Sequence, residues 1–374
     1  MNATGGRSDV HGNGSDVTPD IFERDLARAS TLPARWYTDP AILALERDRI
    51  FARTWQPVGQ ASQVAQPGEF FTAEVAGRPV VVLRDERGEL RGFYNVCRHR
   101  AGPVARGCGK RKSLQCAYHG WTYRLDGSLA TTPDFEGVEC FDRDANSLVP
   151  VHVTTWGPFV FVNLSSERSE RSEPEPLASF LGGIPEATRA FGLETMTFCA
   201  KREWTFDCNW KVYMDNYHEG YHVPLVHPGL FRALDYSRYA TTIQANYEQQ
   251  HAPIRAVEPK RPGEQPYRGE AGEALYYGVF PNWMLNVYPD NVSINVVLPV
   301  GVDRTYTLFE WYFRDPSQKD AIAQTVAFSE EVQEEDIAIC QAVQKGLASG
   351  VYDRGRFSVK REAAVHHFQR RVHE

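Results

Sequence analysis

Hydrophobic and polar positions alternate in two different ways along the chain. In the first half, short apolar runs such as EFFTAEV at 69–75, PVVVLRD at 79–85 and LRGFYNV at 90–96 are separated by Gly, Pro and Asp. Short runs rich in β-branched and aromatic residues, bounded by turn residues, are typical of antiparallel strands. The pattern therefore predicts a small all-β domain over residues 55–164.

The second half mixes strand and helix patterns after a polar segment at 165–176, which is rich in Ser, Glu and Arg and is predicted to be a linker. Because strands and helices do not alternate regularly, residues 177–374 are predicted to form an α+β domain with an antiparallel sheet. No GxGxxG motif occurs, so no nicotinamide or flavin site of that kind is expected. The runs behind this prediction are strand-like at 197–206, 283–299 and 304–313 and helical at about 318–347.

The N-terminal part precedes both patterns. Residues 1–20 are polar and lack the apolar stretch of a secretory signal, so we expect a disordered leader. Residues 21–31 and 40–54 have a helical mix, and Pro40 is well placed to open the second helix. We therefore predict that 21–54 forms helices that pack on the domain formed by residues 177–374.

Composition limits the class of protein. The 374 residues are 42% hydrophobic and 24% charged, and Lys plus Arg (41) against Asp plus Glu (48) gives a net charge of −7. A mildly acidic chain lacks the basic surface that binds nucleic acid or anionic membranes, and no run approaches the roughly 18 to 20 apolar residues of a membrane span. Seven cysteines, an odd number, do not suggest disulfides, so a reducing cytoplasm is expected.

The strongest chemical signal comes from two Cys/His pairs. C-x-H, sixteen residues and C-x2-H bring together Cys97, His99, Cys116 and His119. Two such pairs can bind the two irons of a [2Fe–2S] cluster, and replacing two thiolates by imidazoles raises its reduction potential. The alternatives are a zinc site, although zinc fingers usually pair like ligands, and chance combined with core packing.

A second group of candidate ligands lies in NWKVYMDNYHEGYHVPLVHPG at 209–229. His222 and His227 are five residues apart and would not share one face of a straight helix. Pro224 predicts that a helix ends near His222, so that His227 returns from the following turn. Two imidazoles can then converge on one metal ion.

Two carboxylates precede this pair on one predicted helical stripe. Glu219 is three residues before His222, and Asp215 is four residues earlier again. We expect Glu219 to orient His222 or to relay through it, and we treat Glu219 and Asp215 as candidate catalytic groups. His218 faces away from the stripe and is not expected to be a ligand.

A carboxylate would complete a two-histidine site of the kind that leaves positions open for O2 and substrate. The best candidate is Asp336 in SEEVQEEDIAICQAVQKGL, in the middle of a helical stripe of apolar residues. A carboxylate on a buried face needs a metal or another partner, whereas a partly exposed Asp in an acidic helix is the alternative. The stripe consists of Val332, Ile339, Val343 and Leu347.

These segments together resemble one family. CRHRAG followed by CAYHGWTYRLDG resembles the Rieske domain of the Rieske non-haem iron oxygenases, and the 209–229 segment and the Asp336 helix resemble the iron-binding regions of their large (alpha) subunits. The resemblance covers about residues 35–370 and implies a Rieske domain followed by a helix-grip catalytic domain. It implies a [2Fe–2S] cluster, mononuclear Fe(II) on His222, His227 and Asp336, and Glu219 as the carboxylate that bridges the two centres.

The same resemblance implies a mechanism and partners. Electrons would pass one at a time from the cluster, through His119 and Glu219, to the iron of a neighbouring subunit in a homotrimer. O2 would then be activated beside the substrate. Because the chain has no visible flavin or nicotinamide site, a separate flavin/iron–sulfur reductase that uses NAD(P)H is implied.

The substrate is the least specified feature. CNWKVYMDNY and the stretch through VYDRGRF look most like choline monooxygenases and other quaternary-ammonium oxygenases, and a trimethylammonium group needs an aromatic cage. Hydroxylation or O-demethylation of an aromatic compound is the alternative, because it uses the same metal centres; a Rieske electron-transfer protein is the alternative from another class. Candidate cage residues, which could equally pack a core, are Tyr217, Tyr221, Tyr276, Tyr277, Trp283 and Tyr288.

Overall fold

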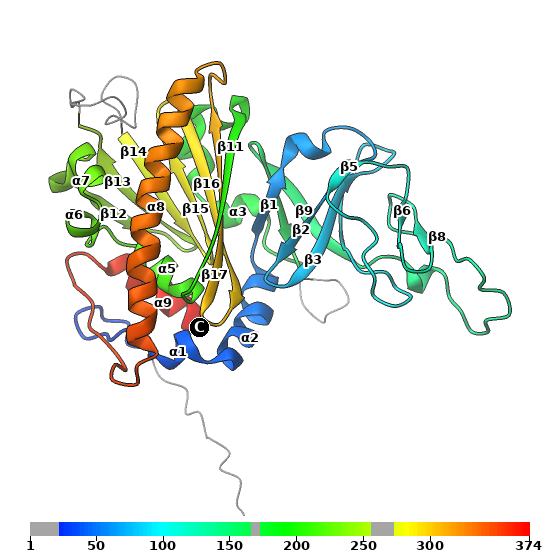
Figure 1. Ribbon diagram of the computed structural model, residues 1–374, viewed down its shortest axis with the longest axis horizontal. Helices are drawn as coiled ribbons and strands as arrows, with labels where there is room; N and C mark the ends of the chain where they lie inside the picture. The colour runs from blue at the N-terminus through cyan, green and yellow to red at the C-terminus, as the bar shows by residue number, and fades with distance from the viewer. Residues whose placement is uncertain (1–21, 166–172, 256–272) are drawn as a thin grey trace, which may run out of the picture.

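The computed structural model describes residues 22–165, 173–255 and 273–374. The leader predicted at 1–20 and most of the linker predicted at 165–176 lie outside these residues. Figure 1 shows two parts side by side: an N-terminal β domain and a larger domain in which helices cover a sheet. The α+β class with antiparallel sheets, predicted from the sequence, is confirmed.

The N-terminal β domain contains two antiparallel sheets. Seven strands pair in the order β1-β10-β9-β4-β3-β2-β5, and the small sheet β6-β7-β8 lies at the end away from the larger domain (Figure 1). The predicted strand at 69–75 coincides with β2. The bounds are β1 Gln56–Gln60, β2 Glu69–Val75, β3 Arg78–Arg84, β4 Leu90–Tyr94, β5 Cys108–Lys110, β6 Leu114–Gln115, β7 Thr122–Tyr123, β8 Leu129–Thr131, β9 Pro150–Trp156 and β10 Phe159–Asn163.

The C-terminal domain has one seven-stranded antiparallel sheet in the order β11-β17-β16-β15-β14-β13-β12. The runs predicted at 197–206 and 304–313 coincide with β11 and β17. The run at 283–299 is not one strand but the hairpin β15–β16, because the chain turns between Tyr288 and Asn291. The bounds are β11 Thr197–Phe206, β12 Ala240–Ile243, β13 Tyr247–Pro253, β14 Glu273–Val279, β15 Trp283–Val287, β16 Asn291–Gly301 and β17 Arg304–Phe313.

The two faces of this sheet have different roles, because side chains alternate along each strand. On one face, Trp283, Leu285 and Val287 of β15 pack in a core with Phe159 and Phe161 of β10, so this face joins the two domains. The opposite face packs against three helices, α5 (Trp210–Tyr217), α8 (Lys319–Leu347) and the C-terminal helix α9 (Ala363–His373). Its core residues include Met284, Val297, Phe309, Trp311 and Phe313.

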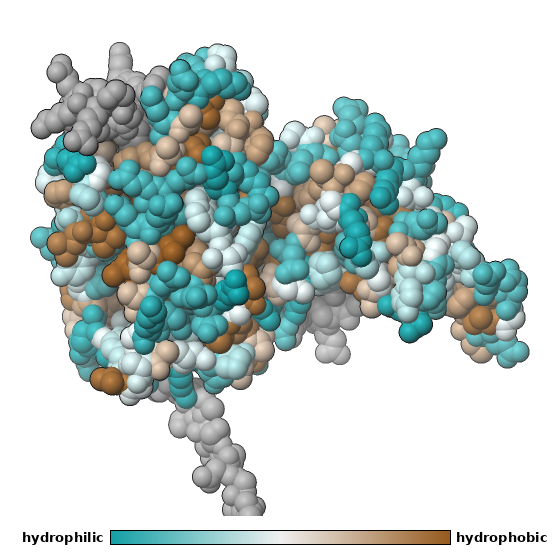
Figure 2. Space-filling view, viewed as in Figure 1, coloured by the Kyte–Doolittle hydropathy of each residue, from teal (hydrophilic) through white to brown (hydrophobic). Residues whose placement is uncertain are grey.

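The longest helix, α8 (Lys319–Leu347), runs along the sheet in Figure 1, beside α5 (Trp210–Tyr217) and α9 (Ala363–His373). Two short helices, α6 (Val223–Val226) and α7 (Pro228–Ala233), flank it, and Figure 2 shows apolar side chains at the surface over them, where Leu225 is 89% exposed. Within the described ranges, no helix combines the length and apolarity that a bilayer span requires. The other α-helices in the described ranges are α1 (Arg35–Thr38), α2 (Pro40–Arg49), α3 (Leu177–Leu181) and α4 (Ile184–Thr188).

The N-terminal segment packs on the C-terminal domain. Asp39 caps α2 and Pro40 occupies its first turn. Glu46 of α2 is buried and contacts Lys211 Nζ at 2.6 Å and Trp210 Nε1 at 2.7 Å, so an ion pair ties α2 to α5. The helix expected over 21–31 is wrong: this stretch forms turns and an isolated strand bridge to the C-terminal segment, whose backbone partners replace helical hydrogen bonds.

Candidate metal centres

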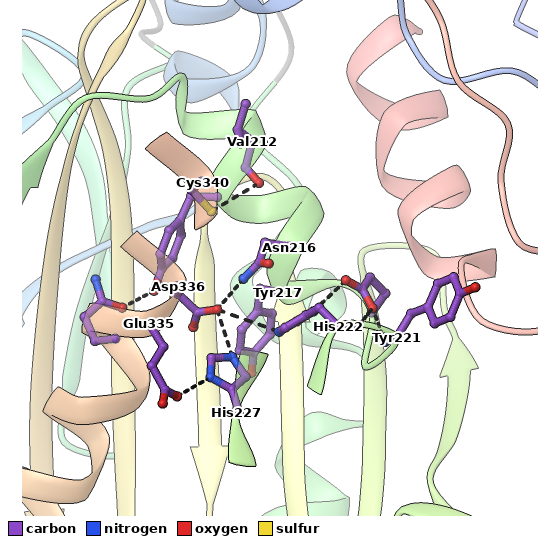
Figure 3. Close-up of polar contacts among 12 residues, drawn as sticks. Val212, Asn216, Tyr217, Tyr221, His222, His227, Glu335, Asp336 and Cys340 are labelled. Atoms are coloured by element: carbon purple, nitrogen blue, oxygen red, sulfur yellow. Dashed lines mark hydrogen bonds and ion pairs between the residues drawn. The ribbon is translucent and has the colours of Figure 1, made fainter. Parts of the chain in front are cut away.

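His222, His227 and Asp336 converge beneath α8. One ligand atom from each lies within 4.8 Å of the other two, and the two imidazole rings are 5.0 Å apart. Figure 3 shows both rings pointing at the Asp336 carboxylate. Two imidazoles and one carboxylate on one side of a metal ion form the donor set of non-haem ferrous sites.

The two histidines are placed by the one-turn helix α6. His222 is its N-cap and His227 its C-cap, so both side chains turn back towards α8. The prediction that a helix ends near His222 is wrong, because α5 ends at Tyr217 and Pro224 lies in the first turn of α6 instead of ending α5. Gly220 lies in the connection, where a Cβ atom would lie 2.6 Å from the Tyr239 ring, so the close packing there requires glycine.

Asp336 is held by neighbours on two other elements. Its Oδ1 accepts a hydrogen bond from Asn216 Nδ2 at 2.6 Å, and it lies 3.0 Å from His227 Nε2 and 3.7 Å from His222 Nε2. The sequence argument placed this residue on a buried face of the helix, which is wrong in part: Ile339 and Val343 of the same stripe are 38% and 45% exposed.

Each candidate histidine ligand has its own carboxylate partner. His222 Nδ1 lies 2.6 Å from Glu219 Oε1, and His227 Nδ1 lies 2.7 Å from Glu335 Oε2. Glu219 also accepts hydrogen bonds from the backbone N–H groups of Tyr221 and His222. A carboxylate on Nδ1 fixes the tautomer and leaves Nε2 free for a metal, so both rings are oriented for coordination.

The charge balance of the site favours a cation. Burial opposes protonation of His227, but the carboxylates of Asp336 and Glu335 outweigh it and raise the pKa of this imidazole. Three carboxylates therefore surround two histidines in the part of the site that the structure describes. A divalent ion would supply the positive charge that these carboxylates attract.

The four predicted cluster residues lie in the loops beside the small β6-β7-β8 sheet. Cys97 and Cys116 are each 3% exposed, and the rings of His99 and His119 meet edge to face at 4.7 Å. The Trp121 ring stacks on His99 at 4.8 Å. The two pairs thus face each other, as the spacing of the motif requires.

The loops fit a bulky inorganic group. His99 Nδ1 is buried and no hydrogen bond from the described chain reaches it, so the atom is free for a metal. A Cβ at Gly102 would lie 2.9 Å from Cys116 Sγ, so the backbone can pass close to this sulfur only with glycine there. Gly120 has a φ of +73°, a conformation that also favours glycine. Tyr123 Oη lies 3.3 Å from Cys97 Sγ.

Comparison with known proteins gives two matches to family models in one chain. Residues 54–142 match the Rieske [2Fe-2S] domain, and residues 193–374 match the ring hydroxylating alpha subunit (catalytic domain). The chain is also 38% identical to the chloroplastic choline monooxygenase of Arabidopsis thaliana over 96% of this chain and 87% of that one. The chain belongs to the Rieske oxygenase family.

Two further relatives agree with this assignment. The Rieske oxygenase chain is 32% identical to the carnitine monooxygenase oxygenase subunit of Escherichia coli (strain K12), over 90% of this chain and 89% of that one. A solved quaternary ammonium Rieske monooxygenase superposes with a TM-score of 0.84 at 28% identity, over 94% of this chain and 97% of that one. The chain is therefore an oxidoreductase of a family that carries a [2Fe–2S] cluster and a non-haem iron.

In this Rieske oxygenase the candidate iron ligands open into a cavity of about 130 Å³ between α5, α8 and the sheet. Tyr217, Tyr276 and Tyr288 line it, as the aromatic-cage hypothesis expects. The rings of Tyr276 and Tyr288 are 5.9 Å apart and nearly perpendicular, at 82°. The cavity therefore has an aromatic wall next to the metal site.

The other three proposed cage residues do not line this cavity. Tyr277 and Trp283 are fully buried on the opposite face of the sheet, in the core that joins the two domains. Tyr221 is 56% exposed, and Figure 3 shows its ring pointing away from the metal site. Strand alternation explains why the assignments of Tyr277 and Trp283 were wrong, because it places neighbours such as Tyr276 and Tyr277 on opposite faces. Tyr221 lies in the bend between α5 and α6 instead of a strand.

The sequence argument missed several polar residues of the site. Asn216 bonds to Asp336, and Gln333, one turn earlier on α8, contacts the hydroxyl of Tyr213. Asn286 and Ser293 line the cavity from the sheet. The three-residue spacing of Gln333 and Asp336 could have indicated Gln333, but the sheet residues depend on strand register, which carries no local motif.

Glu219 and Asp215 share a second hollow, of about 420 Å³, on the other side of α5. Glu219 lines both this hollow and the cavity at the iron site, so it lies between them. Asp215 accepts hydrogen bonds from Tyr37 Oη at 2.6 Å and Gln369 Nε2 at 2.9 Å and does not line the iron cavity. His218 contacts Glu248 in a buried pair away from the ligands.

Proposed function

We propose that the chain is the terminal oxygenase component of a Rieske system that hydroxylates or demethylates a small quaternary ammonium compound such as choline or betaine. O2 and electrons from a separate flavin/iron–sulfur reductase, which uses NAD(P)H, complete the reaction. The observation that carries the substrate class is the tyrosine wall beside a carboxylate-rich metal site.

The cavity has the chemistry of a cation site. A tetra-alkylammonium ion cannot donate strong hydrogen bonds and is held by aromatic faces and by negative potential. Tyr276 and Tyr288 supply the aromatic faces, and Glu219 lines the same cavity. Among the lining residues that the structure describes, none is Lys or Arg, so no cationic side chain repels an ammonium group there. The names of the choline and carnitine relatives support the same substrate class.

The residues have distinct proposed roles. Cys97, His99, Cys116 and His119 hold the cluster, and His222, His227 and Asp336 hold the iron. When bound, the two groups supply single electrons and activation of O2 beside the substrate. Glu219 orients His222 and connects it to the second hollow, whereas Glu335 orients His227.

A homotrimer is part of the proposal. In Figure 1 the sheet that carries the cluster loops lies at the far end of the chain from α5 and α8, so one chain keeps its two centres apart. His119 is exposed, and so are Ile339 and Val343 at the second hollow beside Glu219. Exposed apolar residues around a hollow are typical of an interface. These features support a partner subunit's cluster domain as the electron donor at Glu219.

A cytoplasmic location is also proposed. All seven cysteines are unpaired, and two of them, Cys108 and Cys140, are exposed. Exposed free thiols are expected where the surroundings are reducing, whereas secreted proteins pair them.

Product analysis tests the proposal. The purified protein, a general flavin/iron–sulfur reductase and NADH would be incubated with choline, betaine, carnitine and simple aromatic acids. We expect aldehyde or formaldehyde only from ammonium compounds. Coupled oxidation of an aromatic acid alone would replace this proposal by an aromatic oxygenase.

Iron analysis separates the oxygenase from other classes. An oxygenase should contain about three irons per chain, two in the cluster and one mononuclear, whereas an electron carrier should contain two. Asp336→Ala should remove only the mononuclear iron. Unchanged iron content in this variant would show that the third ligand is wrongly assigned.

A further inference from the structure

The sheet side of the iron cavity carries a short line of polar residues on β15 and β16. Tyr217 Oη donates to Asn286 Oδ1 at 2.7 Å, and Asn286 Nδ2 donates to Ser293 Oγ at 3.0 Å. Asn295 is the next residue of β16 on the same face, and it also lines the cavity. Ser293 is only an acceptor in these hydrogen bonds, so its hydroxyl proton can be donated to another group.

The side-chain oxygen of Asn295, the last residue of this line, has no hydrogen-bond partner in the described chain. The residue is 4% exposed, its Oδ1 is buried, and no hydrogen bond from the described chain reaches that oxygen. An unsatisfied buried acceptor costs about 1–3 kcal/mol, so buried polar groups of this kind usually have a partner. Since the side chain lines the cavity, a bound molecule is the natural partner.

The missing partner must be a donor. Asn295 presents an amide oxygen, which needs an N–H or O–H group, and Ser293 offers an O–H group, which needs an acceptor. A hydroxyl group on the ligand satisfies both, because it donates one hydrogen bond and accepts another. A carboxylate could accept from Ser293 Oγ and from Asn295 Nδ2, but it has no proton for Asn295 Oδ1 and would leave this oxygen without a partner.

We propose that Asn295, with Ser293 and Asn286, forms a subsite for a substrate hydroxyl, so that this oxygenase prefers a quaternary ammonium alcohol to a quaternary ammonium carboxylate. The inference rests on the proposed function and narrows its substrate class. The aromatic wall of Tyr276 and Tyr288 takes the cation, and the β15–β16 residues take the hydroxyl. The size is suitable, because a cavity of about 150 Å³ accommodates benzene, which has nearly as many heavy atoms as choline.

Three ligands that differ at one end test the subsite: choline, ethyltrimethylammonium and glycine betaine. Their dissociation constants would be measured calorimetrically on anaerobic, iron-loaded protein. Choline should bind about tenfold more tightly than ethyltrimethylammonium, which corresponds to one hydrogen bond of about 1.4 kcal/mol. Glycine betaine should bind more weakly than choline by at least the same factor.

The variant Asn295→Leu should remove the preference for choline over ethyltrimethylammonium by changing the affinity for choline alone. It should weaken choline binding about tenfold and leave ethyltrimethylammonium unchanged, because only choline loses a hydrogen bond. Ser293→Ala should act in the same direction and serves if Asn295→Leu does not fold. Asn291→Leu, at a buried asparagine of the same strand outside the cavity, should leave the ratio of the two affinities unchanged.

The outcomes separate this inference from the proposed function. Equal affinity for choline and ethyltrimethylammonium, tighter binding of glycine betaine, or an unchanged ratio in Asn295→Leu would overturn the hydroxyl subsite and leave a quaternary ammonium function standing. Failure of all three compounds to bind would overturn both.

Discussion

Nδ1 of His227 lies 2.7 Å from Oε2 of Glu335, the residue that directly precedes Asp336 on α8. One turn of helix α8 thus supplies both a candidate metal ligand and the carboxylate that orients a second ligand. Glu219, in the loop after α5, orients His222: its Oε1 lies 2.6 Å from His222 Nδ1. The two histidines are therefore fixed independently, by carboxylates from different elements.

Glu335→Ala should weaken iron binding. Without its carboxylate, the His227 ring loses the partner that sets its tautomer, and loss of such an outer partner typically costs 10–100-fold in metal affinity or activity. The measurement is iron retained at equilibrium against a chelator. Glu334→Ala is the matched control, because Glu334 is an exposed neighbour on the same helix. Equal retention by both variants would contradict the role of Glu335.

Glu219→Gln should slow oxidation of the substrate more than it lowers iron content. The amide still accepts hydrogen bonds from Tyr221 and His222, but it loses the charge that links the iron site to the second hollow. We expect a 10–100-fold lower turnover. In a single-turnover experiment with O2 and substrate, the reduced cluster should be oxidised more slowly by the same factor. Cluster oxidation at the rate of the unaltered protein would show that electrons do not pass through Glu219.

Local motifs explain what could be predicted from the sequence. Cys97, His99, Cys116 and His119 stand in short, fixed spacings, so their grouping did not depend on the rest of the fold. The long helix was equally clear, because its pattern extends over 29 residues. The chemistry of both metal centres followed from these features and from the family resemblance.

Tertiary packing decided what could not be predicted. The position of Tyr277 depends on which face of β14 meets α8, and a strand pattern alone does not say which face that is. The connection around Gly220 depends on the ring of Tyr239, which follows it by nineteen residues. Asn295 has no motif at all, and only its place on β16 shows that it reaches the cavity.

Tyr123→Phe should lower the reduction potential of the cluster. Burial first, and then the hydrogen bond with Cys97, raise the pKa of Tyr123, so the phenol stays protonated and donates to the sulfur. A donor to a cluster ligand stabilises the more negative reduced state. Loss of about 1 kcal/mol corresponds to roughly 40 mV for one electron. Tyr118→Phe, at an exposed ring that stacks on His119, should leave the potential unchanged in the same redox titration.

Asp215 should make stability depend on pH in an unusual direction. Burial raises the pKa of this carboxyl to about 6, although the hydrogen bonds from Tyr37 and Gln369 oppose the shift. Between the ordinary value of 3.8 and about 6, the folded protein holds a proton that the unfolded chain releases. The folded state therefore binds more protons in this range, and its stability falls as the pH rises through it.

Asp215→Asn should remove this dependence. The amide oxygen can still accept from Tyr37 and Gln369, and no charge has to be buried above pH 6. Relative to the unaltered protein, the variant should gain up to about 3 kcal/mol between pH 4 and pH 7, since each pKa unit is worth about 1.4 kcal/mol. Urea unfolding followed by tryptophan fluorescence at several pH values measures this difference. Asp303→Asn, at an exposed site, is the control: its stability should depend on pH in the same way as that of the unaltered protein. Parallel curves for Asp215→Asn and the unaltered protein would mean that Asp215 is ionised in the fold, with its charge balanced by its neighbours.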